Sequence, residues 1–236
     1  MSETILVLVK FNVRGNIRFL SHAETVRVFQ RAFVRAGIKM VYSQGFNPHP
    51  RLSLPLPRSV GVEADGDLLC LLVQCEKPDY SELETSSPIF DVEGFKAALA
   101  GQLPEGFKLV SVSVAKAKTS VQPQSANYVF RIRPEFVSEE LKIVIKSLPA
   151  DKTLNIERQM DENGKIRSID VRPFLNSIKL DGEDVVVECK VGSTGSIRVE
   201  EILKLLELDE EKLASPVRRT NVQWQIKERQ ARIMNN

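Results

Sequence analysis

The chain has only two histidines, His22 and His49, and both lie in or beside the most conformationally constrained stretch of the sequence. That stretch is residues 42–58, YSQGFNPHPRLSLPLPR, in which prolines on both sides of His49 fix the backbone and disfavour a helix. A stiff loop that carries Asn47, His49 and Arg51 is typical of a segment that presents side chains to a ligand. We therefore treat the two histidines and this loop as the candidate site.

Imidazole side chains in such a place can act in several ways. His22 can serve as a general base toward a 2′-hydroxyl of RNA if an acid lies within reach. His22 and His49 can bind a metal ion, but a structural zinc site needs four ligands and a catalytic site needs three and a water. Glu24 is a possible third ligand, although a capping box already engages its carboxylate. The simplest alternative for His22 is a hydrogen-bonded histidine packed in the core.

A helix follows directly after Ser21. The spacing of Ser21 and Glu24 predicts a capping box at its start, and Gly37 marks its end. His22 would then occupy the first helical position, on the side that faces the core. The apolar face contains Val26, Phe29, Phe33 and Ala36. The opposite face is a basic stripe of Arg27, Arg31 and Arg35, which is either solvated or in contact with phosphates.

Charge is unevenly distributed along the 236 residues, although the formal net charge is only +2. Residues 1–58 contain nine Lys and Arg and two Glu, which gives a net charge of +7. The last twenty residues carry +4, whereas residues 59–120 carry −5 and residues 121–216 carry −4. If the two basic ends meet in space, they form a positive surface suited to a polyanion.

The composition restricts the class of protein. Hydrophobic residues at 42% and charged residues at 27% are ordinary for a globular protein. No apolar run has membrane-spanning length and no secretory signal is visible, so we expect a cytoplasmic protein without a membrane partner. Cys70, Cys75 and Cys189 are interpreted as core residues in a reducing compartment. Three scattered cysteines do not form an iron–sulfur motif, and we expect no cofactor.

Residues 1–117 are predicted to form an N-terminal unit. Hydrophobic patterns predict a strand, a helix, two strands, a helix and a closing strand, at residues 5–11, 21–36, 52–56, 68–76, 92–102 and 107–115. This order is the split-βαβ, ferredoxin-like pattern.

The second half of the chain is predicted to repeat that order with an insertion. Residues 118–126 have linker composition, rich in Ser and Gln, and residues 127–227 form the second unit. An extra hairpin at 174–191 is predicted around the turn Asp181-Gly182. Residues 228–236 are expected to fray. The predicted fold class is α+β, with two tandem ferredoxin-like units, the second elaborated by this hairpin.

Several segments together resemble the signature of the radical-SAM-linked protein family. In the first third they are RGNIRFLSH (14–22), RAFVRAG (31–37), YSQGFNPHPR (42–51) and LPLPRSVG (54–61). DVRPFL (170–175) and RRT (218–220) resemble the family more weakly. The resemblance implies a companion to a radical SAM protein, either separate from it or fused behind it. The family usually has Leu-Asp after Ser-His, where this chain has Ala23 and Glu24, so the carboxylate is kept but lengthened.

Three hypotheses for the function follow. The leading one is a non-catalytic partner module that binds RNA through a basic N-terminal face and delivers it to a radical SAM protein. Its nucleic-acid or anion-binding residues would be His22, Arg27, Arg31, Arg35, Phe46, Asn47, His49 and Arg51. We expect four of these, His22, Asn47, His49 and Arg51, to converge in one cleft.

The first alternative is a metal-independent endoribonuclease that uses His22, by fold-level analogy with CRISPR repeat-processing ribonucleases. The second is a small-molecule or metal-binding module, which elemental analysis of the purified protein tests.

Incubation of the purified protein with structured RNA, with and without a chelator, separates the first two hypotheses. The partner-module hypothesis predicts no cleavage above that of a His22→Ala variant, because binding alone requires no general base. Chelator-resistant cleavage that is lost in His22→Ala would instead establish the ribonuclease.

Overall fold

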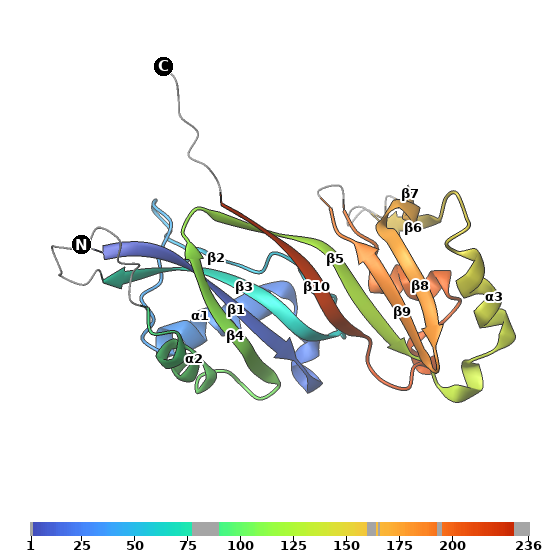
Figure 1. Ribbon diagram of the computed structural model, residues 1–236, viewed down its shortest axis with the longest axis horizontal. Coiled ribbons are helices and arrows are strands. Elements are labelled where there is room, and N and C mark those ends of the chain that lie inside the picture. Colours follow the sequence, from blue (N-terminus) through green and yellow to red (C-terminus); the bar gives the residue numbers. More distant parts are fainter. Residues whose placement is uncertain (1, 77–89, 160–163, 165, 193–194, 229–236) are drawn as a thin grey trace, which may run out of the picture. The chain divides into compact units, whose positions relative to one another are not determined.

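The described chain has a mixed α+β architecture with four α-helices and mostly antiparallel strands (Figure 1). A computed structural model describes residues 2–76, 90–159, 164, 166–192 and 195–228. It divides the chain into two compact units. Unit 1 comprises residues 1–60, 66–122 and 225–236, and unit 2 comprises residues 61–65 and 123–224.

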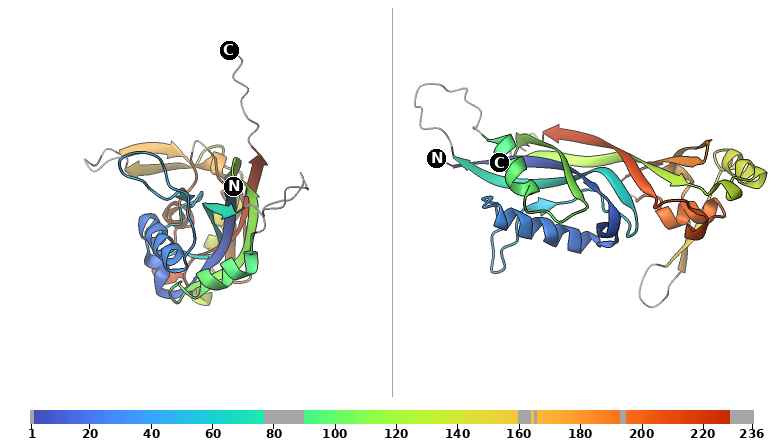
Figure 2. Two further views of the ribbon diagram at one scale, coloured as in Figure 1. Left: turned by 90° about the vertical axis from the view of Figure 1, so that its left-hand side faces the viewer. Right: turned by 90° about the horizontal axis from the view of Figure 1, so that it is seen from below.

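The sheet of unit 1 has the order β4-β1-β3, with the short strand β2 paired to β3. Its strands are β1 (Ser2–Val13), β2 (Leu52–Ser53), β3 (Glu63–Glu76) and β4 (Phe107–Lys116). β1 pairs antiparallel with β4, and β2 pairs antiparallel with β3. The helices are α1 (His22–Arg35) and α2 (Val92–Ala100), and both lie on one face of these strands (Figure 2). A 3-10 turn, η1 (Gly15–Phe19), leads from β1 into α1.

Phenylalanine rings hold the two helices of unit 1 on the sheet. Phe29 of α1 lies with its ring centroid 4.6 Å from that of Phe11 on β1 and 5.2 Å from that of Phe107 on β4. Phe33, one turn further along α1, lies 6.1 Å from Phe95 of α2. Such tilted and edge-on pairs add about 0.5–1.5 kcal/mol each beyond the burial of apolar area. The apolar face predicted for α1 is therefore confirmed where it contains Phe29 and Phe33.

Unit 2 is built on the strand order β10-β5-β9-β8. These strands are β5 (Thr119–Arg131), β8 (Leu175–Asp181), β9 (Asp184–Lys190) and β10 (Arg218–Glu228), and a separate hairpin joins β6 (Asn155–Gln159) to β7 (Ile166–Asp170). The helices are α3 (Glu139–Ser147) and α4 (Val199–Leu205), and the short 3-10 turns are η2 (Pro134–Phe136), η3 (Arg172–Phe174) and η4 (Glu210–Lys212). Their core includes Phe130, Ile132, Leu141, Ile145, Val185, Val187 and Ile202.

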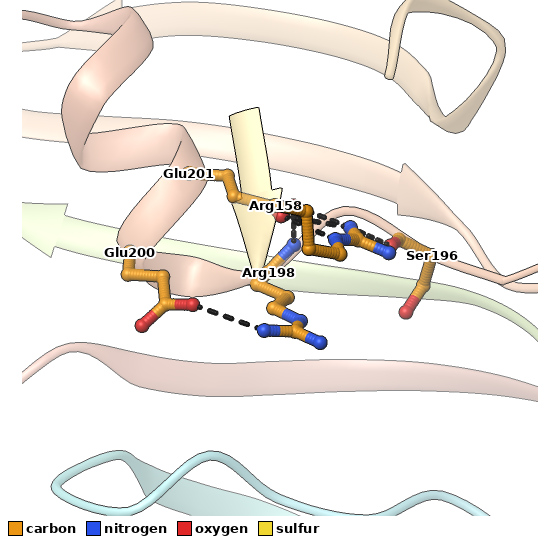
Figure 3. Close-up of polar contacts among 5 residues, drawn as sticks. All are labelled: Arg158, Ser196, Arg198, Glu200 and Glu201. Carbon is orange, nitrogen blue, oxygen red and sulfur yellow. Dashed lines mark hydrogen bonds and ion pairs between the residues drawn. The ribbon is translucent and has the colours of Figure 1, made fainter. Parts of the chain in front are cut away.

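A buried ion pair connects β6 to α4 in unit 2 (Figure 3). Arg158 donates from Nε and Nη2 to the two carboxylate oxygens of Glu201, each at 2.8 Å. Glu201, whose side chain is 3% exposed, also accepts a hydrogen bond from the backbone N–H of Arg198. The hydrogen bonds to Glu201 raise the pKa of Arg158 above its usual value. Because both groups are desolvated, the pair depends on this fork geometry.

The predicted elements are mostly present, and the predicted linker is the main correction. Residues 118–126 lie almost wholly in β5. The backbone of a segment can form the hydrogen bonds of a strand even when its side chains are polar. The predicted extra hairpin is found. Its two antiparallel strands are β8, which begins at Leu175, and β9, which begins at Asp184, and the turn between them contains Gly182. Nearly all of the tail at 228–236, which is expected to fray, lies outside the described residues.

Gly106, directly before β4, lies close against the turn that precedes α1. Its φ is +97°, and a Cβ there would lie 2.5 Å from the carbonyl oxygen of Arg14 and 2.7 Å from Cγ1 of Ile17. We expect Gly106→Ala to lower the free energy of unfolding by about 2–4 kcal/mol, from the left-handed backbone and the clash together. Urea denaturation measures this loss.

Gly15→Ala is the matched control, because Gly15 also has a positive φ, of +65°, and open space around its Cβ position. Its expected loss is about 1 kcal/mol, from backbone strain alone. Equal losses in the two variants would show that the close approach at Gly106 is not a constraint.

Candidate nucleic-acid interface

The start of α1 is fixed by the predicted capping box. The Ser21 backbone N–H and hydroxyl donate to Oε2 of Glu24 at 2.8 and 2.7 Å, and the Glu24 N–H donates to Oγ of Ser21 at 3.3 Å. The bonds from Ser21 hold the pKa of the Glu24 carboxyl below its usual value. The lengthened carboxylate therefore caps the helix, and Arg27, Arg31 and Arg35 follow as exposed side chains on α1.

His22 is exposed, and its predicted position on the core-facing side is wrong. The buried position of this first turn belongs to Thr25, whose hydroxyl donates to the carbonyl oxygen of Ser21 at 2.9 Å. Helix side chains tilt toward the N-terminus, so a residue at the first helical position extends past the end of the helix. The tilt places the imidazole in solvent although the helical wheel assigns it to the apolar side.

The constrained loop is a hairpin with an exposed tip. Tyr42 and Pro50 form an antiparallel bridge, the Ser43 N–H donates to the His49 carbonyl at 2.8 Å, and the His49 N–H donates to Oγ of Ser43 at 3.0 Å. Gly45 reverses the chain with a φ of +131°. The predicted ligand-facing side chains of this segment, Phe46, Asn47, His49 and Arg51, are all exposed. These four side chains are therefore accessible from solvent, and their role in binding a ligand stays a prediction.

The base of this hairpin is tied to β3. The Val41 N–H donates to the Leu72 carbonyl, the Leu72 N–H donates to the Arg51 carbonyl, and the Arg51 N–H donates to the Val41 carbonyl, at 2.9, 3.0 and 2.7 Å. Two of these bonds join the two ends of the hairpin to Leu72 of β3, and the third joins the two ends to each other. The tip is thus attached rigidly, as the prolines predict.

His22 begins α1, whereas the chain enters the hairpin after the last residue of that helix. The helix has 14 residues and is therefore about 21 Å long. Arg35, at the end of α1, leads through Gly37 into the hairpin. A cleft shared by His22, Asn47, His49 and Arg51 stays a prediction, and the interface described here does not require it.

A hollow beside the basic stripe lies between α1 and the loop after α2. It has a volume of about 320 Å³ and is lined in part by Arg31, Arg35 and Gln102. Arg35 donates from Nε to the side-chain oxygen of Gln102 at 3.1 Å and from Nη2 to its backbone oxygen at 2.6 Å. These bonds hold Arg35 in place, whereas Arg31 lies at the rim of the same hollow. Arg31 therefore offers a guanidinium for two-pronged phosphate binding, whereas Arg35, whose Nε and Nη2 are bonded to Gln102, contributes its positive charge.

Arg51 lines a second hollow, of about 340 Å³, on the sheet of unit 1. Ser53, Cys70 and Thr119 also line it, whereas His22, Asn47 and His49 do not. Burial raises the pKa of the Cys70 thiol to about 11. This thiol therefore lines the hollow in its protonated, unreactive form.

Arg58 holds the segment before α1 in place, a role that was not predicted from the sequence. Its side chain is 5% exposed, and its Nε lies 3.8 Å from Oδ2 of Asp67, which is 8% exposed. Nη1 donates to the Arg18 carbonyl at 2.6 Å and Nη2 to the Leu20 carbonyl at 3.4 Å. Arg58 therefore positions the segment that ends at Ser21. Its position at the end of LPLPR, within a motif that resembles the family signature, is the sequence feature that could have indicated this role.

The weaker motif DVRPFL has a structural role in unit 2. Arg172 donates to three backbone carbonyls, those of Pro149, Asp151 and Leu175, at 2.8, 3.1 and 2.9 Å. Asp170 accepts a hydrogen bond from the Arg172 N–H at 3.0 Å. These contacts fix the loop after α3, and they account for the motif without a ligand.

Two further classes of site were sought among the described residues. No group of three or more His, Cys, Asp and Glu side chains there is arranged to hold a metal ion. No α-helix in the described ranges is both long enough and apolar enough to cross a bilayer.

Comparison with known proteins gives a family without an assigned activity. The model of the family described as "uncharacterized protein conserved in bacteria (DUF2344)" matches residues 7–205. The chain belongs to this bacterial family. No curated protein matches the sequence. The family description names neither a ligand nor a radical SAM enzyme, so that association rests on motif resemblance.

Two solved structures were aligned over nearly the whole chain. One is an acetolactate synthase small subunit from Thermotoga maritima, 11% identical over 95% of this chain and 98% of that chain, with a TM-score of 0.22. The other is an unknown protein from Galdieria sulphuraria, 13% identical over 98% of this chain and 100% of that chain, with a TM-score of 0.21. Scores this low carry no argument about the fold or function of this family member.

Substitution of Arg58 tests its role beneath the interface. We expect Arg58→Met to lower the free energy of unfolding by about 3–5 kcal/mol, because it removes a buried cation beside Asp67 and its hydrogen bonds to the carbonyls of Arg18 and Leu20. Chemical denaturation measures the change.

The double variant Arg58→Met with Asp67→Asn is expected to recover part of the loss, since it also removes the carboxylate charge that lies beside Arg58. Additive losses would contradict the assignment of Asp67 as the partner of Arg58.

Proposed function

We propose that this protein is a non-catalytic partner module that binds RNA through unit 1 and presents it to a separate radical SAM enzyme. The observation that carries the proposal is the combination of the exposed Arg27 and Arg31 on α1 with the exposed Phe46 and Arg51 of the hairpin. Guanidinium groups for phosphates and an aromatic ring for a base are the side chains that single nucleic-acid strands require.

The charge around α1 supports an anionic ligand. Residues 1–58 hold nine basic and two acidic residues. One of the acids is Glu24, and the capping box directs its carboxylate to Ser21 at the start of α1. Its negative charge therefore does not neutralise the arginines of the stripe beyond the first turn of the helix. Arg35 is held by Gln102 at the edge of the hollow that Arg31 also lines. A phosphate in this hollow would meet two cations, with little side-chain entropy left to lose at Arg35.

The family resemblance and the sulfur chemistry support a radical SAM partner. The sequence contains three cysteines, and all three are buried as single thiols. Burial raises the pKa of Cys189 to about 12, so this thiol is poorly suited to ligate iron as a thiolate. The iron–sulfur chemistry would therefore belong to the partner, and buried unpaired thiols suit a reducing cytoplasm.

The fold proposed for such a module is a pair of elaborated ferredoxin-like units. In unit 1, β1 and β3 are neighbours, β4 lies antiparallel beside β1, and β2 lies antiparallel beside β3. That order supports a split-βαβ unit. Unit 2 departs from it through the β6–β7 hairpin and the placement of β8 and β9, so the tandem interpretation rests mainly on unit 1.

RNA affinity measured across a salt series tests the proposed interface. For a single strand, log Kd changes with log salt by about 0.7 for each phosphate neutralised. We expect Arg27→Gln and Arg31→Gln each to weaken binding and to reduce this slope by about 0.7, because each removes one phosphate contact.

Arg167→Gln, which removes an exposed arginine from β7 of unit 2, is the matched control and is expected to leave affinity and slope unchanged. Absence of RNA binding, or binding that is indifferent to salt, would exclude the proposal.

The partner is tested separately by affinity purification from the native host. The proposal predicts that a radical SAM protein and RNA are both recovered with the tagged protein. Recovery of RNA without any radical SAM protein would retain the RNA interface and reject the companion role.

A further inference from the structure

We infer that the RNA bound by unit 1 is single-stranded at the hairpin, with Phe46 stacked on an unpaired base and the arginines of α1 following the phosphates of the same strand. This inference rests on the proposed function and deepens it by naming the class of RNA. It follows from three features of unit 1: the position of one aromatic ring, the rigidity of its support and the direction of the basic stripe.

Phe46 has the highest exposure among the large apolar side chains of the described residues, with a relative exposure of 112%. An apolar ring held out in water gains stability only when something covers it. In a duplex the faces of the bases are already stacked, and the A-form major groove is too deep and narrow for side chains to read. An unpaired base has a free π-face, so it can cover this ring.

The support of Phe46 is organised before any ligand binds. The bonds between Ser43 and His49 close the hairpin, and the bonds of Val41, Leu72 and Arg51 fix its base. Pro48 and Pro50 restrict the backbone on the far side of the tip. A ring on such a support loses little conformational freedom on stacking, and this preorganisation favours affinity.

The basic stripe runs toward the hairpin. Arg27, Arg31 and Arg35 are separated by four residues each, or about 6 Å along the helix axis. Arg35 is the last residue of α1, and the chain then enters the hairpin (Figure 2). One flexible strand that passes from Arg27 to Arg35 would leave the stripe at the end of α1 from which the chain enters the hairpin. Three cations in a single row suit one phosphate backbone, whereas duplex-binding domains contact successive grooves of the helix.

The test compares one fluorescently labelled RNA strand of low self-complementarity with the same strand annealed to its complement, using anisotropy at fixed salt. We expect the single strand to bind at least fivefold more tightly than the duplex. Phe46→Ala is expected to weaken single-strand binding by about five- to a hundredfold, the range for loss of one base-stacking contact. Phe46→Tyr, the matched control, keeps a stacking ring and should retain the affinity. Neither change should alter the weak duplex binding.

Each other outcome has a definite meaning. Equal affinity for strand and duplex, or a Phe46→Ala variant with full affinity for the single strand, overturns this inference while salt-dependent RNA binding keeps the proposed function. Absence of binding to either RNA overturns both. If Phe46→Ala retains RNA but no longer recovers a radical SAM protein from the native host, the hairpin is a protein-docking element and the single-strand assignment is wrong.

Discussion

The buried guanidinium of Arg58 is the interaction on which the arrangement of unit 1 depends. It lies 3.8 Å from Asp67 of β3 and binds the carbonyls of Arg18 and Leu20, so it connects the sheet to the segment before α1. A buried arginine that satisfies backbone carbonyls offsets its desolvation by charge-assisted bonds. The capping box follows directly at Ser21, and the direction of α1 is set there. The position of the basic stripe depends on this anchor, whereas the hairpin is attached directly to β3 through Leu72.

The sequence predicted the local features well, because their physical causes are local. The capping box of Ser21 and Glu24 and the β8–β9 hairpin at Gly182 are found where the residue types predict them. Phe29 and Phe33 form the buried side of α1, as their spacing predicts. Such signals need only neighbours three or four positions away, or the turn preference of one glycine.

Features that depend on distant parts of the chain could not be read from the same patterns. The linker predicted at 118–126 lies in β5, since pairing partners far along the sequence decide whether a polar segment becomes a strand. His22 was assigned to the core by its helical phase, but nothing beyond the end of α1 covers it. The role of Arg58 required knowledge that Arg18, Leu20 and Asp67 surround it. Arg172 likewise binds backbone carbonyls 21 and 23 residues away.

The division of the chain into units also limits how the protein can be cut. Unit 1 is assembled from three segments and unit 2 from two, and β3, β5 and β10 each contain residues of both. Val62, for example, belongs to the core of unit 2 although it lies between segments of unit 1. A fragment that ends at residue 117 would expose the apolar side chain of Val62, and a fragment that begins at residue 127 would lack it. A cut between residues 117 and 127 therefore does not follow the boundary between the two units, because it separates Val62 from the core to which it belongs.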